Sequence, residues 1–183
     1  MPLSPPADRE ELHHRRMSFR GYRRQDGRFD IECTLLDTKG YDMTPPGGTR
    51  TVASGEPVHQ MAIRLVVSDQ LVVEDAEASS DATPFDICPE AVGSLAMVKG
   101  LRIGPGWTMT IKLRLGGAAS CTHLVEMLLA MGTAAYQTIV PHNRMKGVET
   151  DGFPLEKKVD SCYAYAAHRP LVHFLRMQHW KRR

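Results

Sequence analysis

The sequence lacks the features that would place it at a membrane or on nucleic acid. No segment approaches the roughly 20 apolar residues that a membrane-spanning helix needs, and the start, MPLSPPADREE, has no apolar core like that of a signal peptide. The net charge is only +2, and the aromatic residues do not alternate with a basic stripe. We therefore expect a cytoplasmic protein that binds neither membrane nor nucleic acid.

Cysteine is scarce, with four residues and no CxxC pair: Cys33, Cys88, Cys121 and Cys162. In a reducing compartment such thiols serve as metal ligands, nucleophiles or buried apolar residues before they form disulfides. Motifs for nucleotides and redox cofactors are also absent, so no nucleotide cofactor is expected.

Two β-hairpins are predicted from apolar residues at every second position. In the first, a strand over residues 17–24 reaches its partner through the turn signal Asp26-Gly27, and the inward row of that partner is Phe29, Ile31, Cys33 and Leu35. The second begins near Val58, turns at residues 68–70 and returns over residues 71–78.

Helices are predicted after these hairpins. The expected segments are 89–99, a helix from Trp107 to the Gly116-Gly117 pair, a central apolar helix over 121–139 capped by Ser120, and 170–183, with a loop over 141–159. Strands first and helices afterwards predict an α+β fold, an antiparallel meander sheet with helices packed on one face. Residues 1–14 are expected to form a flexible arm, and residues 15–183 a single α+β metal-binding domain.

Three residues at the ends of predicted elements form a candidate metal site: His59, Cys88 and Cys121. Both thiols lie where a helix begins, and the partial positive charge there stabilises a thiolate, the form that binds metal. Two thiolates and an imidazole suit zinc or iron, with one ion per chain. The alternative is that the cysteines are buried apolar residues, which fits Cys33 well.

Several motifs resemble a bacterial family called domain of unknown function 2889. They are the segments 55–61, 81–89 and 100–108 and the run Cys121-Thr122-His123-Leu124, within a resemblance over roughly residues 8–165. More remotely, the chain resembles iron–sulfur scaffold proteins of the NifU and IscU kind. That resemblance implies a similar fold and ligand positions at Cys88 and Cys121. The chain departs from it where Pro57 replaces a cysteine and His59 an aspartate.

Further polar residues are candidates for a site. His123 and Glu126, three apart on the central helix, are expected to move protons, either together or with Asp81; a buried hydrogen-bonded pair is the alternative. His123 and Cys121 can share one ion only if Cys121 lies just outside the first helical turn. Arg102 is a candidate for holding an anionic substrate, and Cys162 for a fourth ligand.

These observations predict a metal-dependent enzyme, a lyase or hydrolase, that acts on a small organic substrate. Carbon–carbon cleavage of an oxygenated aromatic compound is one such chemistry. The alternatives are a scaffold or carrier for metal or iron–sulfur clusters, and an interaction module with structural cysteines. Assembly into a homo-oligomer is compatible with all three.

Overall fold

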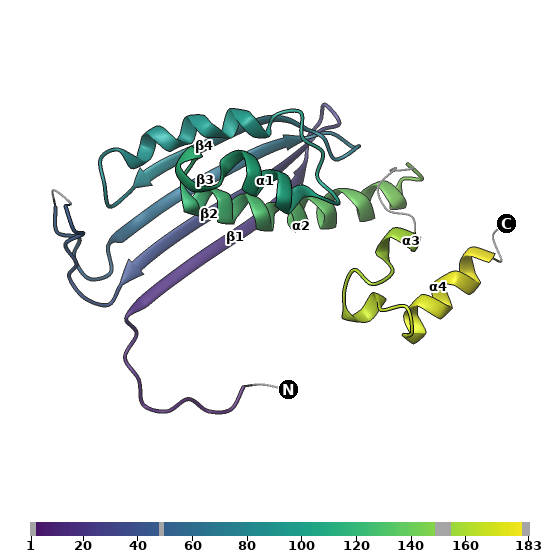
Figure 1. Ribbon diagram of the computed structural model, residues 1–183, viewed down its shortest axis with the longest axis horizontal. Helices are drawn as coiled ribbons and strands as arrows, with labels where there is room; N and C mark the ends of the chain where they lie inside the picture. Colours follow the sequence, from purple (N-terminus) through teal and green to yellow (C-terminus); the bar gives the residue numbers. More distant parts are fainter. Residues whose placement is uncertain (1–2, 48–49, 149–154, 181–183) are drawn as a thin grey trace. The chain divides into compact units, whose positions relative to one another are not determined.

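The computed structural model describes residues 3–47, 50–148 and 155–180, and the chain divides into two compact units, 1–139 and 140–183. The first unit begins with a four-stranded antiparallel sheet in the order β1-β2-β3-β4 (Figure 1). The strands are β1 (His13–Arg23), β2 (Phe29–Lys39), β3 (Pro57–Val67) and β4 (Val73–Ala82). Each strand pairs with the next along the chain, so the predicted meander is confirmed.

The first hairpin has a longer connection than the two-residue turn that Asp26-Gly27 predicted. The backbone N–H of Arg24 donates to the carbonyl of Arg28, which leaves three residues between them. Gly27 lies among these three with φ of 86°, a conformation that glycine adopts without a steric penalty.

One face of the sheet is buried and the other is exposed. The predicted inward row on β2 is confirmed, since Phe29, Ile31, Cys33 and Leu35 are each at most 2% exposed. Every second residue of β3 from Met61 to Val67 is buried beside them. Burial raises the pKa of the Cys33 thiol to about 12, so Cys33 is an apolar core residue.

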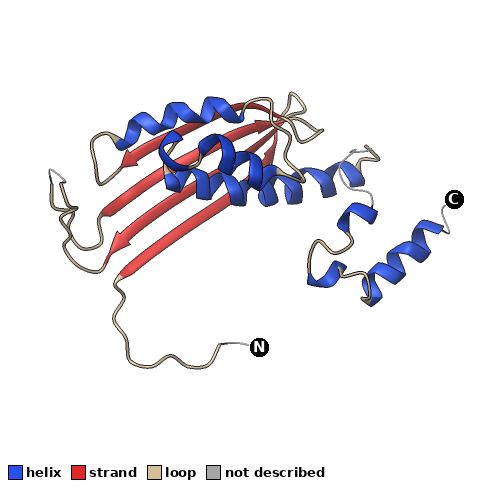
Figure 2. Cartoon of the chain, in the orientation of Figure 1, coloured by secondary structure: helices blue, strands red, loops and turns tan. Residues whose placement is uncertain are grey.

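Helices lie on one face of this sheet (Figure 2). They are the 3₁₀ helix η1 (Cys88–Val98), α1 (Trp107–Leu115), the short η2 (Gly117–Ala119) and α2 (Thr122–Met145). The α+β class and the single-face arrangement are therefore as predicted, and the likeness to the iron–sulfur scaffold fold stays a prediction. The loop expected over residues 141–159 is wrong in two places, because α2 continues to Met145 and a short helix, α3 (Leu155–Lys158), lies near its end. Residues 149–154 of this expected loop lie outside the described part of the chain.

Helix α2 is the core helix of the first unit. By length and composition it is long and apolar enough to cross a membrane, which differs from the expectation that no segment would be. Part of its apolar surface is fully buried in the fold, namely Leu124, Met127, Leu128, Met131, Ala135 and Ile139. A helix that is apolar on most sides is typical of such a central position.

Two glycines allow α2 to approach its neighbours closely. A Cβ atom at Gly21 of β1 would lie 2.0 Å from Thr138 Oγ1, and one at Gly132 would lie 2.6 Å from the Trp107 ring. The Trp107 indole donates a hydrogen bond of 2.9 Å to the carbonyl of Leu128, one turn before Gly132. These contacts set the position of α2 along the sheet and under α1.

The second unit contains α3 (Leu155–Lys158), the 3₁₀ turn η3 (Tyr163–Tyr165) and α4 (Pro170–Trp180). The Arg169 guanidinium lies 4.0 Å from the centre of the Tyr163 ring, a cation–π contact within this unit. The terminal helix predicted over residues 170–183 is present to Trp180, and residues 181–183 lie outside the described part of the chain.

We expect Gly132→Ala to lower the free energy of unfolding by about 2 kcal/mol, because the new methyl group overlaps the Trp107 ring in a packed core. Urea unfolding followed by circular dichroism measures the change. Gly93→Ala in η1 is the matched control, since a Cβ atom there meets nothing within 4 Å. Equal effects of the two substitutions would contradict this account of the α2 contact.

Candidate functional site

A buried carboxylate lies at the polar end of the inward face of the sheet. Asp37 continues the row of Phe29 to Leu35 on β2, yet it is only 1% exposed. Arg15 on β1 donates to both of its oxygens, from Nε to Oδ1 at 2.8 Å and from Nη2 to Oδ2 at 2.7 Å. Burial alone would raise the pKa of Asp37, but the hydrogen bonds and charge of Arg15 outweigh it and lower that pKa.

The strand register aligns three charged or polar residues across the sheet. Arg15 pairs with Asp37, and Asp37 pairs with His59 on β3. Because all three occupy the same face, the Nδ1 atom of His59 lies 3.1 Å from Asp37 Oδ2. His13, two residues before Arg15, lies further from the carboxylate, with Nε2 3.8 Å from Oδ1.

Residues at the start of α2 complete the cluster of polar side chains around Asp37. His123 Nε2 lies 3.8 Å from Asp37 Oδ2, and the rings of His123 and His59 have centres 4.0 Å apart. Glu126, one turn later, accepts a hydrogen bond of 2.7 Å from Arg15 Nη1. The first turn of α2 is therefore joined to both β1 and β2 through charged groups.

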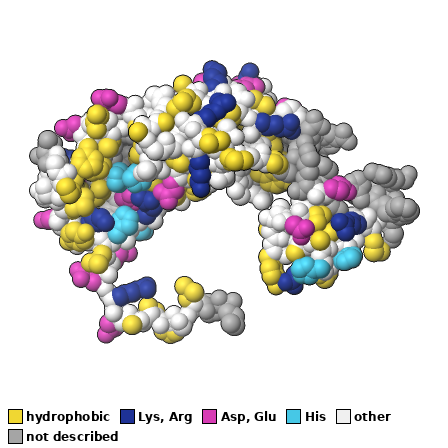
Figure 3. All heavy atoms as spheres, viewed as in Figure 1, with side chains coloured by type: hydrophobic (Ala, Val, Ile, Leu, Met, Phe, Trp, Pro, Cys, Tyr) yellow, Lys and Arg dark blue, Asp and Glu magenta, His cyan; other side chains and the backbone are white. Residues whose placement is uncertain are grey.

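Asp37, His59 and His123 together form a candidate metal centre. One ligand atom from each lies within 4.8 Å of the other two, and no other set of three His, Cys, Asp or Glu side chains does so in the part of the chain that the structure describes. Figure 3 shows histidine side chains next to acidic and basic ones on this face of the first unit. Two imidazoles and a carboxylate are ligands for zinc or ferrous iron.

The electrostatics favour a neutral imidazole at His59. Burial lowers the pKa of His59, and the neighbouring His123 lowers it further, while Asp37 acts in the opposite direction. A metal-binding histidine must be unprotonated, so the lowered pKa suits that role at neutral pH.

Cys121 lies immediately before α2, outside its first turn, which is the condition for sharing a site with His123. Its Sγ is 3.6 Å from His123 Nδ1. This hydrogen bond and the backbone N–H groups of His123 and Leu124 lower the pKa of the Cys121 thiol, against the effect of burial. Cys121 thus occupies the capping position expected for Ser120, whose Oγ instead lies 2.6 Å from Ser94 Oγ.

The predicted ligands His59, Cys88 and Cys121 are not brought together as a set of three. Cys88 begins η1 after the loop that follows β4, and it is half-buried. Within the described residues, no hydrogen bond, ion pair or ring contact joins Cys88 to Asp37, His59 or His123. Within the described residues, the side-chain contact of the Cys121 sulfur is with Nδ1 of His123, whereas the ring nitrogen nearer Asp37 is Nε2.

Glu126 joins the cluster through Arg15, and Asp81, Arg102 and Cys162 do not belong to the described group of candidate ligands. Asp81 is exposed on β4 and accepts a hydrogen bond of 3.4 Å from Ser79. Arg102 forms a bridge with Val72, beside the beginning of β4, whereas the cluster lies toward the end of that strand. Cys162 is exposed in the second unit. Glu126 contacts Arg15, where the sequence had paired it with His123.

Sequence reasoning missed Asp37 and Arg15. The signal for Asp37 was present, because it follows Leu35 by two residues and so falls on the inward row of an otherwise apolar strand. A charged residue at such a position needs a buried partner. Arg15 had no comparable signal, since it lies in the segment next to the expected flexible arm.

The family model described as "Protein of unknown function (DUF2889)" matches residues 13–137. The chain belongs to this family. The match begins at the start of β1 and ends in α2, so it contains all the residues of the cluster. Among the curated proteins and the solved structures, nothing matches the chain.

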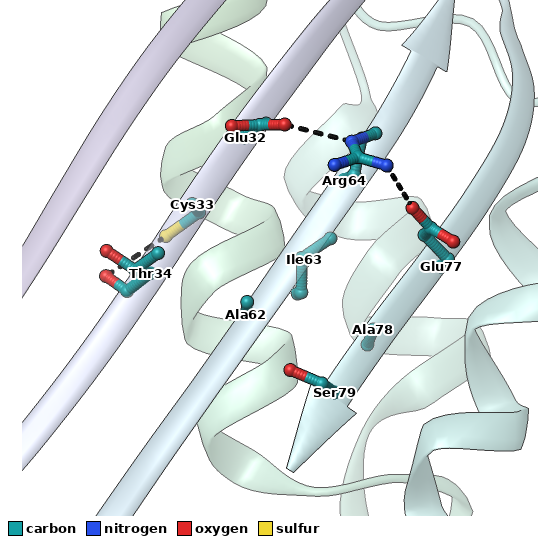
Figure 4. A pocket seen from close by; sticks show the side chains of 9 residues that line it. All are labelled: Glu32, Cys33, Thr34, Ala62, Ile63, Arg64, Glu77, Ala78 and Ser79. Atoms are coloured by element: carbon teal, nitrogen blue, oxygen red, sulfur yellow. Dashed lines mark hydrogen bonds and ion pairs between the residues drawn. The ribbon is translucent and has the colours of Figure 1, made fainter. Parts of the chain in front are cut away.

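A second arginine bridge on the opposite face provides a comparison for Arg15. Figure 4 shows Arg64 of β3 between Glu32 and Glu77, to which it donates hydrogen bonds. These three side chains help to line a groove of about 340 Å³. All three of these side chains are substantially exposed to solvent. Such bridges contribute little to stability, in contrast to one that serves a buried carboxylate.

We expect Arg15→Met to lower the free energy of unfolding by about 2–3 kcal/mol at pH 7, because it leaves Asp37 buried without its main partner. Arg15 lowers the pKa of Asp37, so its stabilisation is present above the ordinary carboxyl pKa of about 4 and is lost as the pH falls through the folded value. Urea unfolding at pH 7 and pH 3 should show a smaller difference at pH 3.

Arg64→Met is the matched control, with an expected loss below about 1 kcal/mol. Equal losses for the two substitutions at pH 7, or an Arg15→Met effect that does not shrink at pH 3, would contradict this account of Asp37.

Proposed function

We propose that the chain is a metal-dependent enzyme, of the lyase or hydrolase type, that holds one zinc or ferrous ion on Asp37, His59 and His123. The observation that carries the proposal is the convergence of these three side chains from β2, β3 and α2, with ligand atoms within 4.8 Å of one another. The proposed set keeps His59 from the sequence prediction and replaces the two thiols by Asp37 and His123.

A centre with three protein ligands supports catalysis better than a purely structural role. Structural zinc sites normally close with four protein ligands, whereas catalytic sites keep a position for water or substrate. At such a position the metal polarises a substrate oxygen or lowers the pKa of bound water toward about 7. The substrate class that suits this chemistry is a small organic molecule with an oxygen function that can reach the ion.

The residues around the three ligands support the same reading. Arg15 holds the Asp37 carboxylate in one orientation through two hydrogen bonds, and Glu126 holds Arg15 from the other side. Outer partners of this kind orient metal ligands and contribute to affinity. Glu126, which is half-exposed and bound to Arg15, is our candidate for a group that exchanges protons with solvent.

A metal-independent function is the second candidate, supported by the contact between Cys121 and His123. Cys121 at the start of α2 lies 3.6 Å from His123, whose other ring nitrogen is the one nearer Asp37. In a catalytic triad a nucleophile, a base and a group that orients the base follow one another in this way. In that case His123 serves Cys121, and no ion is needed. The iron–sulfur scaffold alternative has less support, because clusters are held by several thiolates and this cluster offers one thiol at its edge.

Metal content tests the leading proposal. We expect about one zinc or iron per chain in protein purified without oxygen and without chelators, measured by elemental analysis. His59→Ala, His123→Ala and Asp37→Asn should each lose most of this metal while keeping the circular dichroism spectrum of the wild type. The affinity should fall because each substitution removes one of three ligands.

Cys88→Ser is the control, since Cys88 has no contact with the proposed ligands in the described structure. A folded wild type that takes up no metal, even after reconstitution with zinc or ferrous iron, would reject the proposal. If Cys88→Ser loses the metal and His123→Ala keeps it, the ligands are the thiols that the sequence predicted and not Asp37 and His123.

A further inference from the structure

The two ring nitrogens of His123 face different partners. Nδ1 lies 3.6 Å from Cys121 Sγ, and Nε2 lies 3.8 Å from Asp37 Oδ2. A neutral imidazole carries one proton, so one nitrogen donates a hydrogen bond and the other offers a lone pair. Which nitrogen has the proton decides whether His123 can bind a metal ion beside Asp37 and His59.

Two arrangements fit the positions of the atoms. In the first, Nδ1–H donates to the sulfur of Cys121, and Nε2 presents its lone pair to the ion between His123, His59 and Asp37. In the second, the Cys121 thiol donates to Nδ1, and Nε2–H points toward Asp37. Only the first makes His123 a metal ligand.

The surroundings of Asp37 and Cys121 favour the first arrangement. Oδ2 of Asp37 already accepts from Arg15 at 2.7 Å and lies 3.1 Å from His59 Nδ1. A separation of 3.8 Å from Nε2 is too long for a hydrogen bond to this oxygen, so a proton on Nε2 would lack a partner there. The sulfur of Cys121, by contrast, lies within the range of N–H to sulfur contacts.

We propose that Cys121 is a positioning residue whose sulfur accepts the Nδ1 proton of His123 and thereby leaves Nε2 free to bind the metal. This inference rests on the proposed metal centre and gives Cys121 a role different from that of a ligand. The sulfur lies beside Nδ1, whereas the ring nitrogen nearer the Asp37 carboxylate is Nε2. Metal-binding histidines commonly donate their second ring N–H to an acceptor in this way.

The first test is the tautomer of His123, read from long-range ¹H–¹⁵N spectra of protein labelled with ¹⁵N in histidine. The wild type without metal should carry the proton on Nδ1 of His123. In Cys121→Ala the acceptor is gone, and the population should shift toward the Nε2–H form. Cys121→Ser keeps an acceptor and should keep the Nδ1–H form. A wild-type spectrum with the proton on Nε2 would overturn the inference.

The second test is the affinity for zinc, measured by competition with a chromophoric chelator. We expect Cys121→Ala to bind zinc roughly 10- to 100-fold more weakly than the wild type, and Cys121→Ser to recover most of that loss. Cys88→Ala, which removes the half-buried thiol at the start of η1, should match the wild type. If Cys121→Ala binds zinc as tightly as the wild type, the inference is wrong. If the serine and alanine variants bind zinc equally weakly, the inference is also wrong, because the sulfur is then a metal ligand.

The two tests separate this inference from the metal centre itself. A wild type that binds no zinc rejects the metal centre, while the tautomer still reports whether Cys121 orients His123. A wild type that binds zinc on His59 and His123 but has no dependence on Cys121 keeps the centre and rejects the positioning role. If Cys121→Ala does not fold, the wild-type spectrum and Cys121→Ser decide the question.

Discussion

The buried carboxylate of Asp37 is the constraint on which the polar end of the first unit depends. A carboxylate removed from water loses several kcal/mol of hydration unless charged or hydrogen-bonding groups replace the solvent. Arg15 supplies two hydrogen bonds, and His59 lies within hydrogen-bonding distance of the same oxygen that Arg15 contacts. Arg15 and His59 can meet this need because they lie directly opposite Asp37 on the neighbouring strands.

The same requirement extends to α2. Close packing sets the helix against β1, where Gly21 faces Thr138, and against α1, where Gly132 faces the Trp107 ring. At its beginning the helix meets the sheet through Glu126 on Arg15 and through His123 beside Asp37. The helix is therefore held by close packing in its middle and by charge at its start. The ligands that we propose lie on two strands and a helix that are each held by other contacts, and such pre-organisation favours metal binding.

Much of the fold could be predicted because apolar residues recur at every second position in a strand and at every third or fourth position in a helix. The alternation from Phe29 to Leu35 predicted the buried face of β2, and the apolar run after Cys121 predicted the core helix.

The candidate site could be predicted only in part. His59 and His123 could be named as candidates, but the partner that joins them, Asp37, depends on strand register, and register is a long-range property. Pairing Arg15 with Asp37 and Asp37 with His59 needs the turn lengths of two connections. The continuation of α2 beyond Pro141 was missed because proline usually marks a boundary.

The change of ligand set also changes the chemistry that the chain can support. The sequence drew attention to thiols, which are soft ligands and suit zinc or iron–sulfur clusters. The described structure gathers one oxygen and two nitrogens instead, with a sulfur behind one imidazole. We propose that this set holds an ion that polarises oxygen, while the sulfur orients one histidine. The Cys121 thiol can act either as a hydrogen-bond acceptor for His123 or as a nucleophile that His123 activates. The position of the proton on the His123 ring therefore distinguishes the proposed metal-dependent enzyme from its metal-free alternative.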